Sequence, residues 1–90
     1  MFKPLEELIA VIRQRKESSI QESYTYKLLN NKKLSVEKVK EEITELIDAI
    51  EKNTNKIHEA ADVLYHLMVL LEVSDIKIED VLKELKKRQK

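Results

Sequence analysis

The chain has 90 residues, enough for one domain over residues 1–90 and no more. Its 17 basic and 17 acidic residues balance, so no overall field attracts nucleic acid or an anionic membrane. Cysteine is absent, which excludes disulfides and thiolate chemistry, and the lack of glycine and scarcity of aromatic residues disfavour a β-rich fold. The composition therefore predicts an all-α protein.

No targeting or membrane-spanning segment is expected. The N-terminus "MFKPLEEL" carries acidic residues close to Met1 and has no long apolar run, unlike a secretory signal. The apolar run from Val63 to Leu71 is far shorter than the ~20 residues of a membrane span. We therefore expect a soluble, cytoplasmic protein.

The first half of the chain predicts two helices. The first begins near Pro4, a residue suited to the first turn of a helix, and ends in the basic residues 13–16, where the helix dipole favours cations. Residues 17–23 are polar and predict a loop. A short second helix follows and ends at Asn30 and Asn31, which are expected to adopt the left-handed conformation.

The second half predicts three more elements, giving a compact bundle of four to five helices. One helix runs from an N-cap at Ser35 to about Lys52, and the next, apolar almost all round, from about Lys56 to Glu72. A last amphipathic helix begins near Ile78. Because so short a chain cannot supply a large core, the apolar helix predicts self-association. An apolar stripe is expected along the third helix, made of Val36, Val39, Ile43, Leu46, Ile47 and Ile50.

Two pairs of acidic residues suggest a function. Glu42 is expected at the edge of the stripe and Glu45, three residues later, just beyond it. Glu59, Asp62 and His66 share one side of the following helix. The short connection between these helices favours antiparallel packing, which can bring the pairs together. Converging carboxylates repel one another unless a cation lies between them. Oxygen ligands without cysteine suit Mg²⁺ or Mn²⁺.

Other interpretations of these acids stay open. Glutamates three apart on a charged helix are often solvated surface, and an acid in an apolar helix can be paired with lysine or arginine. A di-iron site requires Glu three residues before His, and neither His58 nor His66 has one. A non-catalytic helical dimerisation module would also carry an apolar helix without needing the acids.

The spacing E-x-x-E followed by E-x-x-D resembles the metal motif of the MazG-like all-α nucleoside triphosphate pyrophosphohydrolases. Four stretches are similar to one branch of that superfamily, the phosphoribosyl-ATP pyrophosphohydrolases (HisE-type) of histidine biosynthesis. These stretches are "SYTYKLL" at 23–29, "KVKEEITEL" at 38–46, "EAADVLYHLMVLL" at 59–71 and "IKIEDVLKELKKR" at 76–88. The resemblance extends from about Leu5 to Arg88.

The resemblance implies a MazG-like helical homodimer that hydrolyses phosphoribosyl-ATP to phosphoribosyl-AMP and pyrophosphate with Mg²⁺, for which Mn²⁺ is a possible substitute. The alternative within the superfamily is an enzyme acting on other nucleoside triphosphates. Matched position by position, the metal-binding acids are Glu42, Glu45, Glu59 and Asp62. Glu41 matches an adjacent acid of the same block and is expected to be catalytic, and a carboxylate such as Glu41 or Glu45 is expected to serve as the general base.

The same comparison implies residues that bind the substrate and its phosphates. They are Arg13, Arg15, Ser23, Tyr24, Thr25, Lys27 and Lys38. Tyr65 and His66 match a tyrosine–histidine pair of the family, and we expect them to support the acidic residues through hydrogen bonds.

Overall fold

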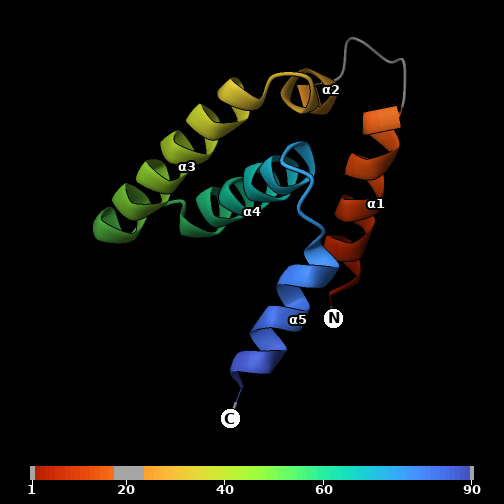
Figure 1. Ribbon diagram of the computed structural model, residues 1–90. Helices are drawn as coiled ribbons and strands as arrows, with labels where there is room; N and C mark the ends of the chain where they lie inside the picture. The colour runs from red at the N-terminus through yellow and green to blue at the C-terminus, as the bar shows by residue number, and fades with distance from the viewer. Residues whose placement is uncertain (1, 18–23, 90) are drawn as a thin grey trace.

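The structure, a computed structural model, describes residues 2–17 and 24–89 (Figure 1). Within these ranges the secondary structure is entirely helical, which confirms the all-α prediction. The helices are α1 (Lys3–Glu17), α2 (Tyr24–Leu29), α3 (Lys32–Lys52), α4 (Lys56–Val73) and α5 (Ile78–Arg88). None of the helices in the described ranges combines the length and the apolar composition that crossing a membrane requires.

The helices α3 and α4 form an antiparallel hairpin, and they share the most extensive interface of the chain (Figure 1). This arrangement confirms the packing predicted from their short connection. The helices α1 and α2 pack against α4, so α4 lies centrally. The core forms where α1, α2 and α4 meet, around the buried side chains of Ile12, Leu28, Met68 and Val69.

The start of α3 differs from the prediction. Its N-cap is Asn31, whose Oδ1 accepts a hydrogen bond from the Leu34 backbone N–H at 3.0 Å. Ser35, the predicted cap, instead lies inside the helix and is only 1% exposed. Its hydroxyl donates to the Leu28 carbonyl at 2.7 Å, so this serine ties α2 to α3.

Left-handed backbone occurs at different asparagines from those expected. Asn31 has φ −146°, and neither it nor Asn30 is among the described residues with positive φ. Those residues are Asn53, Asn55 and Asp75. Asn53 has φ 54° and ψ 47° and ends α3, and Asn55 has φ 52° and begins α4. Short polar side chains tolerate this conformation, and two such residues let the chain reverse between the helices without glycine.

The apolar stripe predicted on α3 is only partly buried, because Val39 is buried and Val36 and Leu46 are half-buried but the isoleucines face outward. Its isoleucines are about half exposed, whereas Val39, Glu42 and Ala49 are buried. The predicted register was therefore wrong: Glu42 faces inward and lies in the buried face rather than at its edge. A single chain leaves large apolar side chains of the hairpin exposed to water, namely Ile43, Ile47, Ile50, Ile57 and Leu64.

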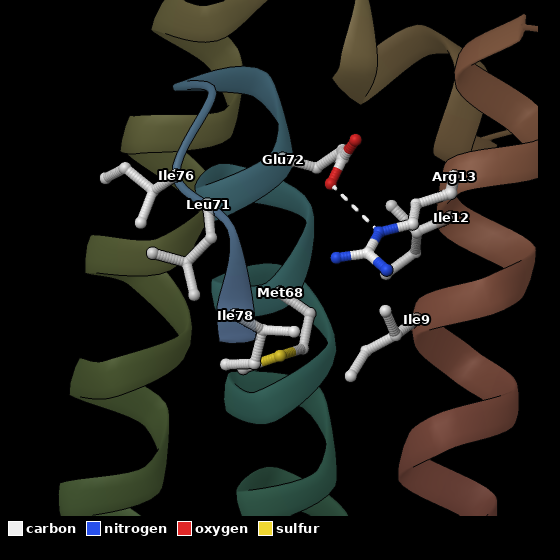
Figure 2. Close-up of a pocket in the computed structure, with 8 residues that line it drawn as sticks. All are labelled: Ile9, Ile12, Arg13, Met68, Leu71, Glu72, Ile76 and Ile78. Atoms are coloured by element: carbon white, nitrogen blue, oxygen red, sulfur yellow. Dashed lines mark ion pairs between the residues drawn. The ribbon is translucent and has the colours of Figure 1, made fainter. Parts of the chain in front are cut away.

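Ion pairs hold the C-terminal segment to α1. The Arg13 guanidinium donates to both carboxylate oxygens of Glu79, at 2.6 and 3.0 Å, and its Nε lies 3.8 Å from Glu72 Oε2 (Figure 2). This hydrogen-bonded pairing lowers the pKa of Glu79 to about 2. Lys16 Nζ lies 3.1 Å from Asp75 Oδ1. The beginning of α5 is thus fixed by charge, while the rest of α5 extends beyond the other helices (Figure 1).

A small cavity lies beside these ion pairs, between α1, α4 and the beginning of α5 (Figure 2). Its volume of about 10 Å³ is roughly that needed by one water molecule. The lining is mainly apolar: Ile9, Ile12, Arg13, Met68, Leu71, Glu72, Ile76 and Ile78. A cavity of this size is a packing defect of the core and is too small for a nucleotide.

Candidate active site

The α3–α4 hairpin brings the predicted acidic residues together. Each of the two helices carries three residues whose possible metal-ligand atoms all lie within 4.8 Å of one another. On α3 they are Glu41, Glu42 and Glu45, and on α4 they are His58, Glu59 and Asp62. Glu45 links the groups, because its carboxylate raises the pKa of both Glu42 and Glu59. The two pairs thus lie near each other, as expected from antiparallel packing of the helices, and we call these six residues the acidic cluster.

The cluster is electrostatically strained without a cation. Burial raises the pKa of Glu42, and the neighbouring Glu45 carboxylate raises it further. Glu59 has a raised pKa for the same two reasons. Among the described residues, the Oε2 atoms of both Glu42 and Glu59 are buried and have no hydrogen-bond partner. A buried acceptor that lacks a donor is costly, so something in the working protein is expected to meet these oxygens.

A hard divalent cation fits this donor set. Mg²⁺ and Mn²⁺ are bound by carboxylate oxygens, and a cation would satisfy both unpartnered atoms while reducing the repulsion. The rival interpretation, neutralisation by lysine or arginine, lacks support: within the described ranges neither residue type forms an ion pair with Glu42, Glu45 or Glu59. The residues that could hold the ion are Glu42, Glu45, Glu59 and Asp62.

The structure adds His58 to the cluster, a residue that sequence reasoning used only to exclude a di-iron site. Its Nε2 lies 3.3 Å from Asp62 Oδ2, one helical turn away. The i, i+4 spacing of His58 and Asp62 was the signal that could have revealed the pair. A neutral imidazole at this position could orient the Asp62 carboxylate or contribute a nitrogen ligand.

A hydrogen-bond network connects α2 to α4 beside the cluster. His66 is buried, and its Nδ1 lies 2.8 Å from the Asp62 carbonyl oxygen. A carbonyl only accepts, so Nδ1 carries the proton and Nε2 accepts from the Tyr24 hydroxyl at 2.9 Å. Thr25 and Tyr65 are joined by a second hydrogen bond between their hydroxyls. His66 thus contacts the Asp62 backbone rather than its carboxylate, and the two side-chain pairs dock α2 on the acid-bearing helix. The predicted support of the acidic side chains by Tyr65 and His66 stays a prediction.

Lys38 is the predicted phosphate-binding residue that lies nearest to the acids. Its Nζ is 3.5 Å from Glu41 Oε2, and the charge of Glu41 raises the Lys38 pKa. Lys38 also lowers the pKa of Tyr24, although burial is stronger and the net shift of that phenol is upward. Lysine, tyrosine and carboxylate groups therefore meet at the beginning of α3, next to the cluster.

The other predicted basic residues are not gathered at the acids. Arg13 is occupied by its pairs with Glu79 at the start of α5 and with Glu72, the second of which is drawn in Figure 2. Arg15 is half-buried on α1, and Lys27 is exposed on α2. Ser23 lies outside the residues that the structure describes.

The acidic cluster opens at the turn of the hairpin. A pocket of about 210 Å³ there reaches two of the acids, Glu45 and Glu59. The other lining residues were not singled out from the sequence. The complete lining is Glu45, Asp48, Ala49, Lys52, Thr54, Asn55 and Glu59. A ligand of moderate size can therefore approach the acids from this end, past a lysine.

Comparison with known proteins assigns the family. The profile of the phosphoribosyl-ATP pyrophosphohydrolase family matches residues 5–89. The chain is 46% identical over 90 residues to the phosphoribosyl-ATP pyrophosphatase of Clostridium novyi, covering 96% of this chain and 81% of that protein. It is 41% identical over 90 residues to the enzyme of the same name from Haloarcula marismortui, covering 94% and 92%.

A further relative is longer. The histidine biosynthesis bifunctional protein HisIE of Pyrococcus furiosus is 42% identical over 87 residues, covering 96% of this chain. The match spans only 41% of that protein, so the chain corresponds to one part of it. With a family profile matched over almost its whole length, the chain belongs to the phosphoribosyl-ATP pyrophosphohydrolase family.

Proposed function

We propose that this protein hydrolyses phosphoribosyl-ATP to phosphoribosyl-AMP and pyrophosphate, an early step of histidine biosynthesis, with Mg²⁺ or Mn²⁺ as cofactor. The observation that carries the proposal is the acidic cluster, with its two buried, unpartnered carboxylate oxygens. The membership of the family and the names of the relatives support the choice of substrate.

Glu42, Glu45, Glu59 and Asp62 would hold the divalent ion. Such an ion offsets the negative charge of the phosphates and makes water more acidic. Two of these acids, Glu42 and Glu59, have a buried oxygen without a partner in the described part of the chain, which supports this assignment. His66 holds α2 against α4 by its bond to the Tyr24 hydroxyl.

The reaction requires a proton acceptor and a means of stabilising the leaving group. Glu41 or Glu45 accepts the proton of the attacking water as its oxygen bonds to the α-phosphorus and the α–β anhydride bond breaks. Lys38, beside Glu41, is placed to bind phosphate oxygens, and Lys27 is a second exposed cation on α2. The leaving pyrophosphate takes both electrons of the broken P–O bond.

The proposal includes a homodimer and a cytoplasmic location. The exposed apolar side chains of the α3–α4 hairpin support self-association, since a single chain leaves them in contact with water. Nucleic acid and membranes are not proposed as partners, because the net charge is zero.

The decisive experiment compares substrates. The purified protein is given phosphoribosyl-ATP, ATP or dCTP with Mg²⁺, and both pyrophosphate and the nucleotide product are identified. We expect turnover of phosphoribosyl-ATP far above the other two, with phosphoribosyl-AMP as the product. Equal turnover of ATP would replace this function by a broader triphosphate pyrophosphohydrolase, and no turnover of any substrate would favour the non-catalytic module.

A further inference from the structure

Tyr24 presents a partly exposed aromatic ring next to the acidic cluster. Its side chain is on the first residue of α2 and is 46% exposed. Phe2 is also exposed, but it lies beside an apolar pocket between α1 and α4, and the remaining tyrosines of the chain are half-buried. Exposing an aromatic ring to water is unfavourable, so its presence beside a charged site calls for an explanation.

The ring is held in one orientation by three neighbours. The Tyr65 ring lies nearly parallel to it, with centroids 6.3 Å apart and planes inclined by 21°. The His66 ring meets it edge-on, with centroids 5.8 Å apart, and its Nε2 accepts the Tyr24 hydroxyl at 2.9 Å. Tyr65 is itself fixed by the hydroxyl of Thr25. The ring is thus held by its neighbours and is still partly exposed, so a ligand can contact it.

The charges around the Tyr24 phenol locate the ring relative to the acids. Lys38, Glu41 and Glu42 all act on it electrostatically. The ring therefore lies at the α2 end of the acidic cluster, whereas the pocket lined by Lys52 and Thr54 opens at the hairpin turn, the other end. A nucleotide whose phosphates lie at the acids would have this ring within reach of its base if it extends toward α2.

We propose that Tyr24 is the platform on which the purine ring of the nucleotide substrate stacks, with Tyr65 and His66 holding that platform in place. The proposal rests on the proposed function, since it takes a purine nucleotide as the ligand. Stacking on a fixed aromatic ring involves no rotamer ordering on binding, which favours affinity. It would orient the substrate with its base toward α2 and its phosphates toward the acidic cluster.

The test measures the contribution of the base to binding separately from that of the phosphates. KM for phosphoribosyl-ATP is measured together with inhibition constants for AMP, which has a base, and for tripolyphosphate, which has none. The variants are Tyr24→Leu and Tyr24→Phe, with Phe2→Leu as the matched control. Stacking on one aromatic side chain changes affinity on the order of 5- to 150-fold. Tyr24→Leu should raise KM and the AMP constant within that range and leave the tripolyphosphate constant unchanged.

The controls fix the meaning of each outcome. Tyr24→Phe keeps the ring but loses the hydroxyl that bonds to His66, so it should bind AMP more tightly than Tyr24→Leu does. Phe2→Leu should change neither constant. Unchanged AMP affinity in Tyr24→Leu, or an equal loss for AMP and tripolyphosphate, would overturn the proposal. If Tyr24→Leu does not fold, Tyr24→Trp supplies the chain's one tryptophan. AMP should then quench its fluorescence and tripolyphosphate should not, and the absence of quenching by AMP would equally refute stacking.

This design also distinguishes the inference from the proposed function. An original chain that releases pyrophosphate normally, with Tyr24→Leu unchanged in KM, would refute the stacking platform alone. An original chain that releases none would refute the proposed function, and the AMP quenching of Tyr24→Trp would still decide whether the ring binds a purine.

Discussion

Replacing Glu42 with glutamine is expected to stabilise the protein in the absence of divalent ions, although it removes a residue of the acidic cluster. The Glu42 side chain is 8% exposed, its Oε2 has no partner among the described residues, and Glu45 repels its charge. Glutamine has nearly the same shape and no charge, so it removes both the repulsion and the greater part of the desolvation cost.

The size of the expected stabilisation by Glu42→Gln follows from the free-energy cost of burying a group without a partner. A buried polar group without a partner costs about 1–3 kcal/mol, and an ionised one more. The glutamine amide also needs partners, so we expect a recovery of about 1–2 kcal/mol in the free energy of unfolding. In a domain of this size each kcal/mol corresponds to about 4–8 °C, which gives a rise in Tm of about 4–16 °C.

The assay is thermal unfolding in a chelator and in excess Mg²⁺, with Glu51→Gln, an exposed position on the same helix, as the control. An ion that binds only the folded state at 100 times its Kd adds about 2.7 kcal/mol, so the original chain should gain Tm in Mg²⁺. The Tm of Glu42→Gln should rise little in Mg²⁺, so the original chain should become the more stable of the two. A variant that is less stable in chelator, or one that gains as much from Mg²⁺ as the original chain, would refute this account of the cluster.

The contribution of Glu42 to the stability of the fold should depend on pH in a defined direction. Because the folded protein raises the Glu42 pKa above its ordinary value of 4.5, protonation of this group stabilises the fold at low pH. That contribution is lost as the pH rises through the folded pKa. In chelator, the advantage of Glu42→Gln should therefore be largest at neutral pH and disappear below 4.5. An advantage that stays constant over this range would contradict the raised pKa.

Further predictions concern the rest of the fold. Since pairing with Arg13 lowers the Glu79 pKa to about 2, stability from this pair should be lost as the pH falls from 4.5 toward 2, and Glu79→Gln should show no such loss in acid denaturation curves. Ser35→Ala removes the donor to the Leu28 carbonyl and should lower Tm by about 4–8 °C, for a loss of about 1 kcal/mol. Asn53→Ala should cost about 1–2 kcal/mol in urea unfolding because its φ is 54°, whereas Asn53→Gly should not.

Helix positions and the acidic pairs were predictable from local pattern. The spacing of Glu59 and Asp62 puts both on one side of any helix, and the short turn after Lys52 leaves antiparallel packing as the simple solution. The family resemblance is confirmed by the profile match and the relatives. The roles of the site residues stay predictions.

The register of α3 could not be read from the sequence. Burying the isoleucines is the choice that hydrophobicity favours, yet Glu42 takes the inward face and Ile47 is 51% exposed. Sequences depart from the local rule at functional sites, and neither helix alone reveals such a departure. The long-range pairs were also inaccessible, because Arg13 and Glu79 are 66 positions apart and no spacing rule connects them.

The most direct test of the central claim, that the converging acids form a divalent-metal site for pyrophosphate release, is a single comparison. Pyrophosphate release from phosphoribosyl-ATP is measured for the original chain, Glu59→Gln and Glu51→Gln, each with Mg²⁺ and after chelation. We predict Mg²⁺-dependent release by the original chain and by Glu51→Gln, and none by Glu59→Gln. Undiminished release after chelation, or by Glu59→Gln, would contradict the account.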